Sequence, residues 1–357
     1  MRTTLKLAAI VALVAASAST PAAERLVPTS IGPTLQSIGP LAFGPDGTLY
    51  AGDRQAATIF ALDLGAQAAS PTAGTKDITN IDTTIASMLG VGAADISIAD
   101  IAVHPRSRNT FIAVMRGQGP AAQPALLRVD GAGKIDLVAM DTVKFTSVAI
   151  PNPAQGQARN NAITDVAFAN GRVWVAGLSN EEFASKLWSV AYPFTTADAG
   201  ASVEIFHGNH NAIETRSPIM SFVPYMVGNQ PHIIGGYTCT PLVKFAIDSL
   251  KTGDKVRGTT IAELGAGNRP IDMVLYKKDG QEFLLMANTS RGVMKIPTAG
   301  FASATPITDR VGGTAGVPFE TVASLTGIEQ LDLLDSMKAM VIAKIGASRN
   351  LQAVILP

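Results

Sequence analysis

Residues 41–64, LAFGPDGTLYAGDRQAATIFALDL, decide the fold because they contain one complete strand pattern. A short apolar strand leads through the turn residues Pro45-Asp46-Gly47 into the strand LYAGD, and a polar loop then leads into another strand. Five further units repeat this order, and they begin at Ile98, Ala162, Pro218, Pro270 and Gly327. Six copies of one strand order predict an all-β, six-bladed β-propeller.

Fourth strands and ring closure can also be predicted. A strand-like segment follows each of the first five units, as at 134–140, 201–206 and 259–264, whereas the sixth unit ends at Pro357 after its third strand. A propeller with an incomplete last blade leaves an unpaired edge. We therefore expect residues 24–30 to pair with the strand at Leu351–Leu356 and to close the ring.

The N-terminus has the pattern of a secretory signal peptide over residues 1–23. Arg2 and Lys6 precede an apolar stretch, and small residues allow cleavage after Ala18 or after Ala23. The apolar stretch is too short to span a bilayer. We expect residues 24–357 to form a single propeller domain that is secreted or periplasmic and has no membrane span.

Composition excludes several functional classes. The chain has 28 basic and 28 acidic residues, a formal net charge of zero and a pI of about 6.9. No general electrostatic field therefore attracts it to nucleic acid, and we expect no nucleic-acid partner. No P-loop, dinucleotide-binding fingerprint or GxSxG motif is present. Any charged function must be local.

A candidate metal site lies between residues 207 and 239, which contain three of the four histidines and the only cysteine. Propeller topology places His207, His210 and Cys239 in loops on one face. His232 begins the strand that ends near Cys239, so it lies a strand length away. The candidate ligands are His207, His210, Cys239 and Glu214.

The ligand types narrow the metal but do not establish it. Two imidazoles and a thiolate suit copper or zinc, and calcium is a third candidate ion. Two alternatives stay open: the histidines are solvated loop residues while Cys239 is a small buried apolar side chain, or Cys239 beside a histidine is a nucleophile.

Cationic side chains predict a second candidate site, for an anion. Arg216 and Arg269 stand just before the inner strands of the fourth and fifth units, and Arg291 and Tyr237 lie in nearby loops. Guanidinium groups that converge on a concave site bind carboxylate or phosphate. In the alternative, each arginine pairs with a neighbouring acid such as Glu214 or Asp272.

Three aspartates recur within the inner strands, at Asp100, Asp165 and Asp272. We expect them to bond backbone N–H groups that would otherwise lack partners in the channel wall, which is a structural role.

The first unit resembles the six-bladed propellers of the NHL and SMP-30/gluconolactonase type. The matching features are Gly39-Pro40, the strand 41–43, the turn Asp46-Gly47 and the strand 49–53. The resemblance implies the six-bladed fold and, for SMP-30-type hydrolases, a metal-dependent activity. Those hydrolases place a metal-binding glutamate where this sequence has Ile38, and the asparagine of their PNG step is missing from Pro270-Ile271-Asp272.

Two classes of function follow from these features. We expect an exported binding or scaffold propeller whose loop-rich face recognises a small anionic ligand, a metal ion or a partner protein. The alternative is a metal-dependent propeller enzyme, either an SMP-30/lactonase-like hydrolase or a copper oxidoreductase. No residue is identified as catalytic.

Overall fold

A computed structural model describes residues 30–69, 74–239 and 241–357. The expected signal peptide, residues 1–23, and most of the expected closing strand, residues 24–29, lie outside the described residues.

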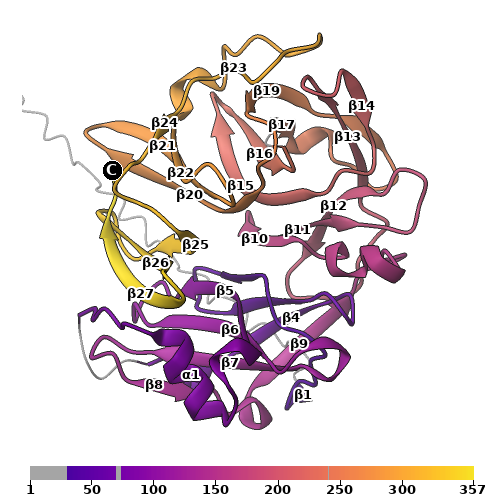
Figure 1. The fold of residues 1–357 in the computed structure, drawn as a ribbon. Coiled ribbons are helices and arrows are strands. Elements are labelled where there is room, and N and C mark those ends of the chain that lie inside the picture. The colour runs from indigo at the N-terminus through magenta and orange to yellow at the C-terminus, as the bar shows by residue number, and fades with distance from the viewer. Residues whose placement is uncertain (1–29, 70–73, 240) are drawn as a thin grey trace, which may run out of the picture.

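Six sheets surround a central axis and form the six blades (Figure 1). Blade one runs from its inner to its outer strand as β2 (Leu41–Phe43), β3 (Leu49–Asp53), β4 (Thr58–Asp63), β9 (Lys144–Ala149) and β1 (Ser30–Ile31). Blade two contains β5 (Ile96–Val103), β6 (Thr110–Arg116), β7 (Gln123–Val129) and β8 (Ile135–Leu137). Blade three contains β10 (Asp165–Ala169), β11 (Arg172–Leu178), β12 (Ser185–Ala191), β13 (Ala201–His207) and β14 (Ala212–Glu214), with β18 (Lys255–Arg257) parallel to β13.

Blades four to six follow the same plan. Blade four contains β15 (Ile219–Val227), β16 (Gln230–Tyr237), β17 (Pro241–Ala246), β19 (Thr259–Leu264) and β23 (Thr314–Gly316). Blade five contains β20 (Pro270–Lys278), β21 (Gln281–Asn288), β22 (Val293–Pro297) and β24 (Glu320–Thr321). Blade six contains β25 (Ile328–Leu333), β26 (Lys338–Ile345) and β27 (Ser348–Ile355). The repeat units of the sequence are thus confirmed as blades.

Helical segments are short and lie in the connections. The α-helix α1 spans Ile81–Leu89. The 3-10 helices among the described residues are η1 (Gly65–Ala68), η2 (Ala93–Asp95), η3 (Gly119–Ala121), η4 (Met140–Thr142), η5 (Gly156–Asn161), η6 (Ile247–Ser249) and η7 (Thr298–Gly300). In the part of the chain that the structure describes, no helix has the length and apolar character needed to cross a membrane.

The blades do not follow one another around the ring in chain order. Contacts between inner strands run from β2 to β5, then to β25, β20, β15 and β10, and from β10 back to β2. Blade two therefore lies between blades one and six, and blade three lies on the other side of blade one. The chain makes blades one and two, returns past blade one, and completes the ring in the opposite direction (Figure 1).

The strand that pairs with β4 in blade one is not the one predicted from the sequence. We expected a fourth strand directly after the first unit, but the chain there forms η1 and then α1. The edge of β4 is instead paired with β9, which comes after blade two, in the register Ile59 to Val148 and Phe60 to Ser147. Because β9 follows blade two in the chain and pairs with β4 of blade one, it connects these two blades. From β9 the chain continues around the ring in the opposite direction.

Ring closure also differs from the prediction. The predicted closing strand, residues 24–30, overlaps the described residues only at Ser30. Ser30, the last residue of the expected closing strand, pairs with Phe145 of β9 in blade one. The outer edge of blade six instead meets the segment before α1, where Ile78 and Leu351 exchange two backbone hydrogen bonds of 2.8 and 2.9 Å. Asp77 and Asn350 side chains add hydrogen bonds across the same contact. Blade six is thus fastened to the connection that leads into blade two.

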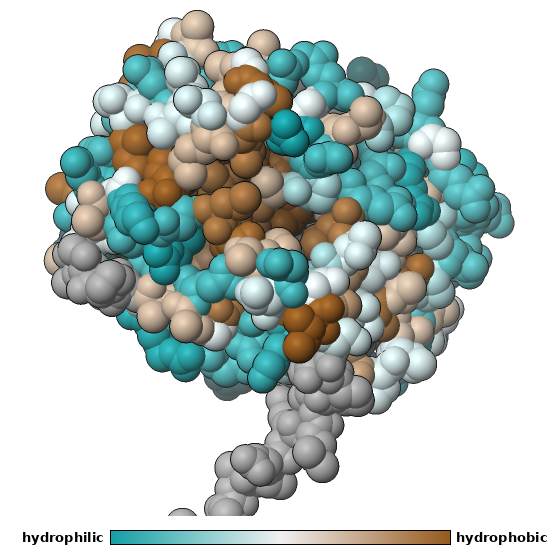
Figure 2. Space-filling model, turned by 90° about the horizontal axis from the view of Figure 1, so that it is seen from below, coloured by the Kyte–Doolittle hydropathy of each residue, from teal (hydrophilic) through white to brown (hydrophobic). Residues whose placement is uncertain are grey.

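Apolar clusters fill the spaces between neighbouring blades. Trp188, Tyr50 and Val173 belong to the cluster between blades one and three, and Trp174 belongs to the next cluster, with strands of blades three and four. Both tryptophans are therefore core residues. Figure 2 shows hydrophobic residues gathered in a hollow on one side of the molecule, with hydrophilic residues around it.

Ring closure can be tested by truncating Leu351. This side chain is fully buried with Ile81 and Ile85 of α1. Replacing Leu351 with Ala should lower the free energy of unfolding by about 2–5 kcal/mol, the usual cost of emptying such a site. The matched control is Leu137→Ala at a half-exposed position of β8. Chemical denaturation would contradict this role of α1 and β27 if both variants unfolded at the same denaturant concentration.

Candidate functional site

A cavity of about 1410 Å³ opens at the axis of the ring. Inner-strand residues of several blades line its walls, and loops after β3 and β6 and the segments leading into β10 and β20 form its rim. We call it the axial cavity. Several loops of different blades meet there, so side chains from different parts of the chain reach one recess, as is usual for small-molecule sites.

Carboxylates of the inner strands line the wall of this cavity. Asp100 accepts a hydrogen bond from the backbone N–H of Leu41, at 2.6 Å, and Asp165 accepts one from Phe222, at 2.7 Å. Asp272 accepts one from Leu331, at 3.0 Å. Each carboxylate therefore ties its own inner strand to that of the neighbouring blade. The predicted structural role of these aspartates is confirmed.

A fourth aspartate also links its inner strand to that of the neighbouring blade, and the sequence analysis missed it. Asp332 on β25 accepts a hydrogen bond from the backbone N–H of Val103, at 2.7 Å. The repeat alignment puts Gln330 at the place of Asp272, because both strands have a register shift just before that position. The alternation of strand side chains would have pointed to Asp332, two residues farther along the same face.

Burial changes the ionisation of these four carboxyls. Removal from water raises the pKa of Asp165 to about 7 and the pKa of Asp332 to about 6, although backbone hydrogen bonds act in the opposite direction. Burial likewise raises the pKa of Asp100 and of Asp272, and the neighbouring carboxylates add to both shifts. Of these four, Asp100, Asp165 and Asp272 line the axial cavity, and their carboxyls keep protons at higher pH than ordinary aspartates do.

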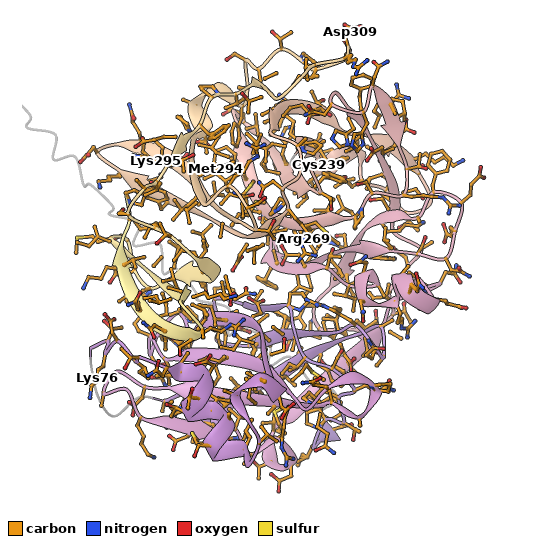
Figure 3. All side chains as sticks on the ribbon, viewed as in Figure 1. Lys76, Cys239, Arg269, Met294, Lys295 and Asp309 are labelled. Atoms are coloured by element: carbon orange, nitrogen blue, oxygen red, sulfur yellow. The ribbon has the colours of Figure 1, made fainter. Side chains whose placement is uncertain are left out.

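Two arginines reach the same cavity, and we call them the arginine pair. Arg54 directly follows β3. Arg269, labelled in Figure 3, directly precedes β20. Burial lowers the pKa of Arg54, with Asp100 and Asp165 opposing the shift and Arg269 adding to it. The Nε atom of Arg54 is buried and has no hydrogen-bond partner among the described residues. Neither guanidinium has a salt bridge within the described chain.

The other residues predicted for anion binding lie elsewhere. Arg216 is exposed and does not line the axial cavity. Arg291 donates a hydrogen bond to the carbonyl of Ala266, at 2.9 Å. Tyr237 is buried in the apolar cluster between blades three and four, where burial raises the pKa of its hydroxyl above its usual range. The cavity thus combines Arg269 with Arg54 rather than with Arg216.

Three of the four predicted metal ligands come together at the contact between blades three and four. His207, His210 and Cys239 each offer one ligand atom, and these atoms lie within 4.8 Å of one another. We call these residues the Cys–His cluster. None of them lines the axial cavity, and Figure 3 shows Cys239 farther from the ring centre than Arg269.

The local fold explains how the histidines meet. His207 ends β13, and a tight turn brings the chain back as β14, so that His210 lies against His207 with ring centroids 3.8 Å apart. Glycine is needed in this turn, because a Cβ atom on Gly208 would lie 2.7 Å from Val311. The Nδ1 atoms of His207 and His210 lie 2.9 and 2.6 Å from the same carboxylate oxygen of Glu214.

Two glutamates surround the Cys–His cluster. Burial alone would raise the pKa of Glu214, but hydrogen bonds from the two histidines outweigh it and hold that pKa at about 2. Glu263, missed by the sequence analysis, is fully buried on β19 and accepts hydrogen bonds from the Gly208 N–H and the Asn209 amide. Glu263 lies in an otherwise apolar strand of the next blade, so no local sequence pattern predicts that it reaches this turn. Only the packing of the two blades brings it there.

Comparisons with known proteins give a fold likeness only. No family model matches the chain, and no curated protein matches it. Among solved structures, the PQQ-bound aldose sugar dehydrogenase of Streptomyces coelicolor is 13% identical with a TM-score of 0.32, over 92% of this chain and 99% of that one. A putative oxidoreductase (glucose dehydrogenase) of Thermus thermophilus is 13% identical with a TM-score of 0.36, over 91% of this chain and 99% of that one.

A third similar structure is the propeller of Dos1, which is 10% identical with a TM-score of 0.32, over 88% of this chain and 66% of that one. At such identities and TM-scores these likenesses carry no argument about activity. The six-bladed propeller rests on the strand pairing itself, and the narrower resemblance to NHL and SMP-30 propellers stays a prediction.

Proposed function

We propose that this protein binds a small anionic molecule, a carboxylate in the first instance, in the axial cavity, with the arginine pair as its charged anchors. The expected signal peptide supports a binding role outside the cytosol. The observation that carries the proposal is the arginine pair itself: two guanidinium groups line one cavity, and neither forms a salt bridge in the described chain.

Electrostatics at the cavity favour such an anion. Two like charges placed together repel, and Arg269 indeed contributes to lowering the pKa of Arg54. A bound carboxylate or phosphate would relieve this repulsion and accept hydrogen bonds from both planar groups. The nearby carboxyls of Asp100 and Asp165 oppose binding less than ordinary aspartates would, because their raised pKa values keep them largely neutral at mildly acidic pH.

The size of the cavity argues for a ligand with more than one charged or polar group. A volume of about 1410 Å³ exceeds what a single acetate or phosphate fills, and it lies above the usual range for small-molecule sites. The β6–β7 loop, residues 117–122, lines the same space. We therefore expect a multivalent carboxylate to bind better than a small monovalent one.

Replacing Arg269 with Lys tests this function. Calorimetric titration of the mature protein with acetate, succinate, citrate and inorganic phosphate should show binding that strengthens with the number of carboxylates. Arg269→Lys should weaken citrate binding about tenfold or more, because a point charge loses the paired hydrogen bonds of the guanidinium group. Arg54→Lys should act in the same direction.

The control is Arg216→Lys, the same substitution at an exposed arginine outside the cavity. It should leave citrate binding unchanged. Equal weakening in all three variants would show that the effect is not specific to the axial cavity, and either this result or an absence of binding by every anion in the series would overturn the proposal.

A further inference from the structure

The Cys–His cluster combines ligand types that metals of intermediate softness prefer. One thiol and two imidazoles converge within 4.8 Å, and they come from two different blades. Calcium and magnesium are bound mainly by oxygen ligands, whereas zinc and copper are bound by cysteine and histidine. The donor set therefore narrows the candidate ions of the sequence analysis to zinc and copper.

The orientation of the imidazoles supports a metal site. Both Nδ1 atoms face one oxygen of Glu214, so each ring can donate its Nδ1–H there and leave its other nitrogen with a free lone pair. A carboxylate behind a histidine is the usual partner of a metal-binding imidazole, since it fixes both the tautomer and the direction of the ring. Glu214 thus orients the histidines instead of acting as a fourth ligand.

One ligand atom of the cluster is buried without a partner. His207 is 1% exposed, and its Nε2 atom makes no hydrogen bond within the described chain. Leaving a buried polar atom without a partner is unfavourable, so this nitrogen is suited to bind a metal ion. The nearest acid is Glu263, whose Oε2 lies 3.7 Å from this nitrogen. That carboxylate adds negative charge where a cation would sit.

Cys239 is held in place by the backbone rather than by its side chain. Its φ of 61° lies in the left-handed region, which non-glycine residues rarely adopt, and its N–H donates to the carbonyl of Asn268 at 2.7 Å. Cys239 is a half-buried residue.

We propose that His207, His210 and Cys239 bind one zinc or copper ion, with Glu214 orienting both histidines and with a coordination position left for Glu263 or water. On binding, the thiol releases its proton to solvent and the sulfur ligates as thiolate. The site lies outside the axial cavity, so it does not depend on the anion-binding function. It would also fasten blade three to blade four.

Metal titration of the mature protein tests the site. The protein is reduced, freed of metal with a chelator and desalted without oxygen. It is then titrated with Zn²⁺ by calorimetry, with Co²⁺ by absorption spectroscopy and with Cu⁺ against a coloured chelator. We expect one ion per chain, a thiolate-to-cobalt charge-transfer band and no binding of Ca²⁺. Stoichiometric binding of either Zn²⁺ or Cu⁺ supports the site.

Variants separate ligands from the orienting residue. Cys239→Ser should abolish the charge-transfer band, and His210→Ala, at an exposed position, should weaken binding strongly without loss of the fold. Glu214→Gln should weaken binding by about 10- to 100-fold while the band and the stoichiometry remain, as for other carboxylates behind metal ligands. The control His232→Ala removes a buried histidine whose Nδ1 donates to the carbonyl of Gln230, and it should leave metal binding unchanged.

Circular dichroism would show that each variant is folded. The proposal is overturned if the wild-type protein binds no ion stoichiometrically, or if Cys239→Ser and His210→Ala bind as tightly as the wild type.

Discussion

Replacing Asp53 with Ala is expected to destabilise the propeller by about 3–5 kcal/mol, because it removes the acceptor of a buried hydrogen-bond network. Asp53 ends β3 and is fully buried. Its carboxylate accepts hydrogen bonds from the N–H groups of Gln36, Ser37, Gln55 and Ala56 and from the Ser37 hydroxyl, at 2.6–3.1 Å. Without it these donors are left buried or poorly solvated.

The Asp53→Ala substitution should also disturb the axial cavity. The segment at Gln36 and the turn after Asp53 both line that cavity, and the turn carries Arg54. Chemical denaturation measures the stability, and citrate titration of the folded fraction measures the cavity. Asp63→Ala is the matched control, since Asp63 is exposed and, within the described part of the chain, its carboxylate accepts a hydrogen bond only from the Gly65 N–H. This variant should stay within about 0.5 kcal/mol of the wild type. Similar stabilities for the two variants would show that the network contributes little.

Stability is expected to fall as the pH rises from about 4 to about 7, the opposite of what paired surface carboxylates give. In the unfolded chain an aspartate ionises near pH 4. In the folded chain Asp165 keeps its proton up to a pKa of about 7 and Asp332 up to about 6. The folded state therefore binds more protons in this window, so each such carboxyl lowers the free energy of unfolding by up to about 1.4 kcal/mol per pH unit.

A carboxyl whose pKa is lowered by folding has the opposite effect on stability, and Glu214 is such a group. Glu214, with a pKa of about 2, gives stability that is present above its unfolded pKa near 4 and is lost only at more acidic pH. It therefore does not cancel the effect between pH 4 and 7. Thermal unfolding should show a higher melting temperature at pH 5 than at pH 8, and Asp165→Asn should flatten that difference. A melting temperature that rises with pH over the same range would refute the prediction.

The repeat units could be predicted from sequence because the signals are local. Turn residues such as Pro45-Asp46-Gly47 fix hairpins over a few residues, and alternating apolar strands need a common core. The same locality explains why the roles of Asp100, Asp165 and Asp272 were found, since they occupy matching places in the units. Asp332 was missed because Gln330 occupies the matching place in the sixth unit and the aspartate stands two residues farther along the strand.

The candidate sites were predicted only in part. The proximity of His207, His210 and Cys239 follows from propeller topology, and the structure brings their ligand atoms together. The arginine pair was not predicted as such, because the sequence does not show which arginines point toward the ring axis. Arg54 follows a strand end in blade one and lines the same cavity as Arg269 of blade five, although the two residues are far apart in the chain.

The sequence by itself determined the blades, their inner strands and their turn chemistry, since each depends on contacts within a few tens of residues. Only the tertiary structure decided the order of the blades, the return of β9 to blade one, and the fastening of β27 by the segment at Ile78. The physical reason is that an exposed strand edge accepts any strand of suitable length and polarity. Which strand completes it depends on the packing of the whole ring, because backbone hydrogen bonds are the same for every candidate.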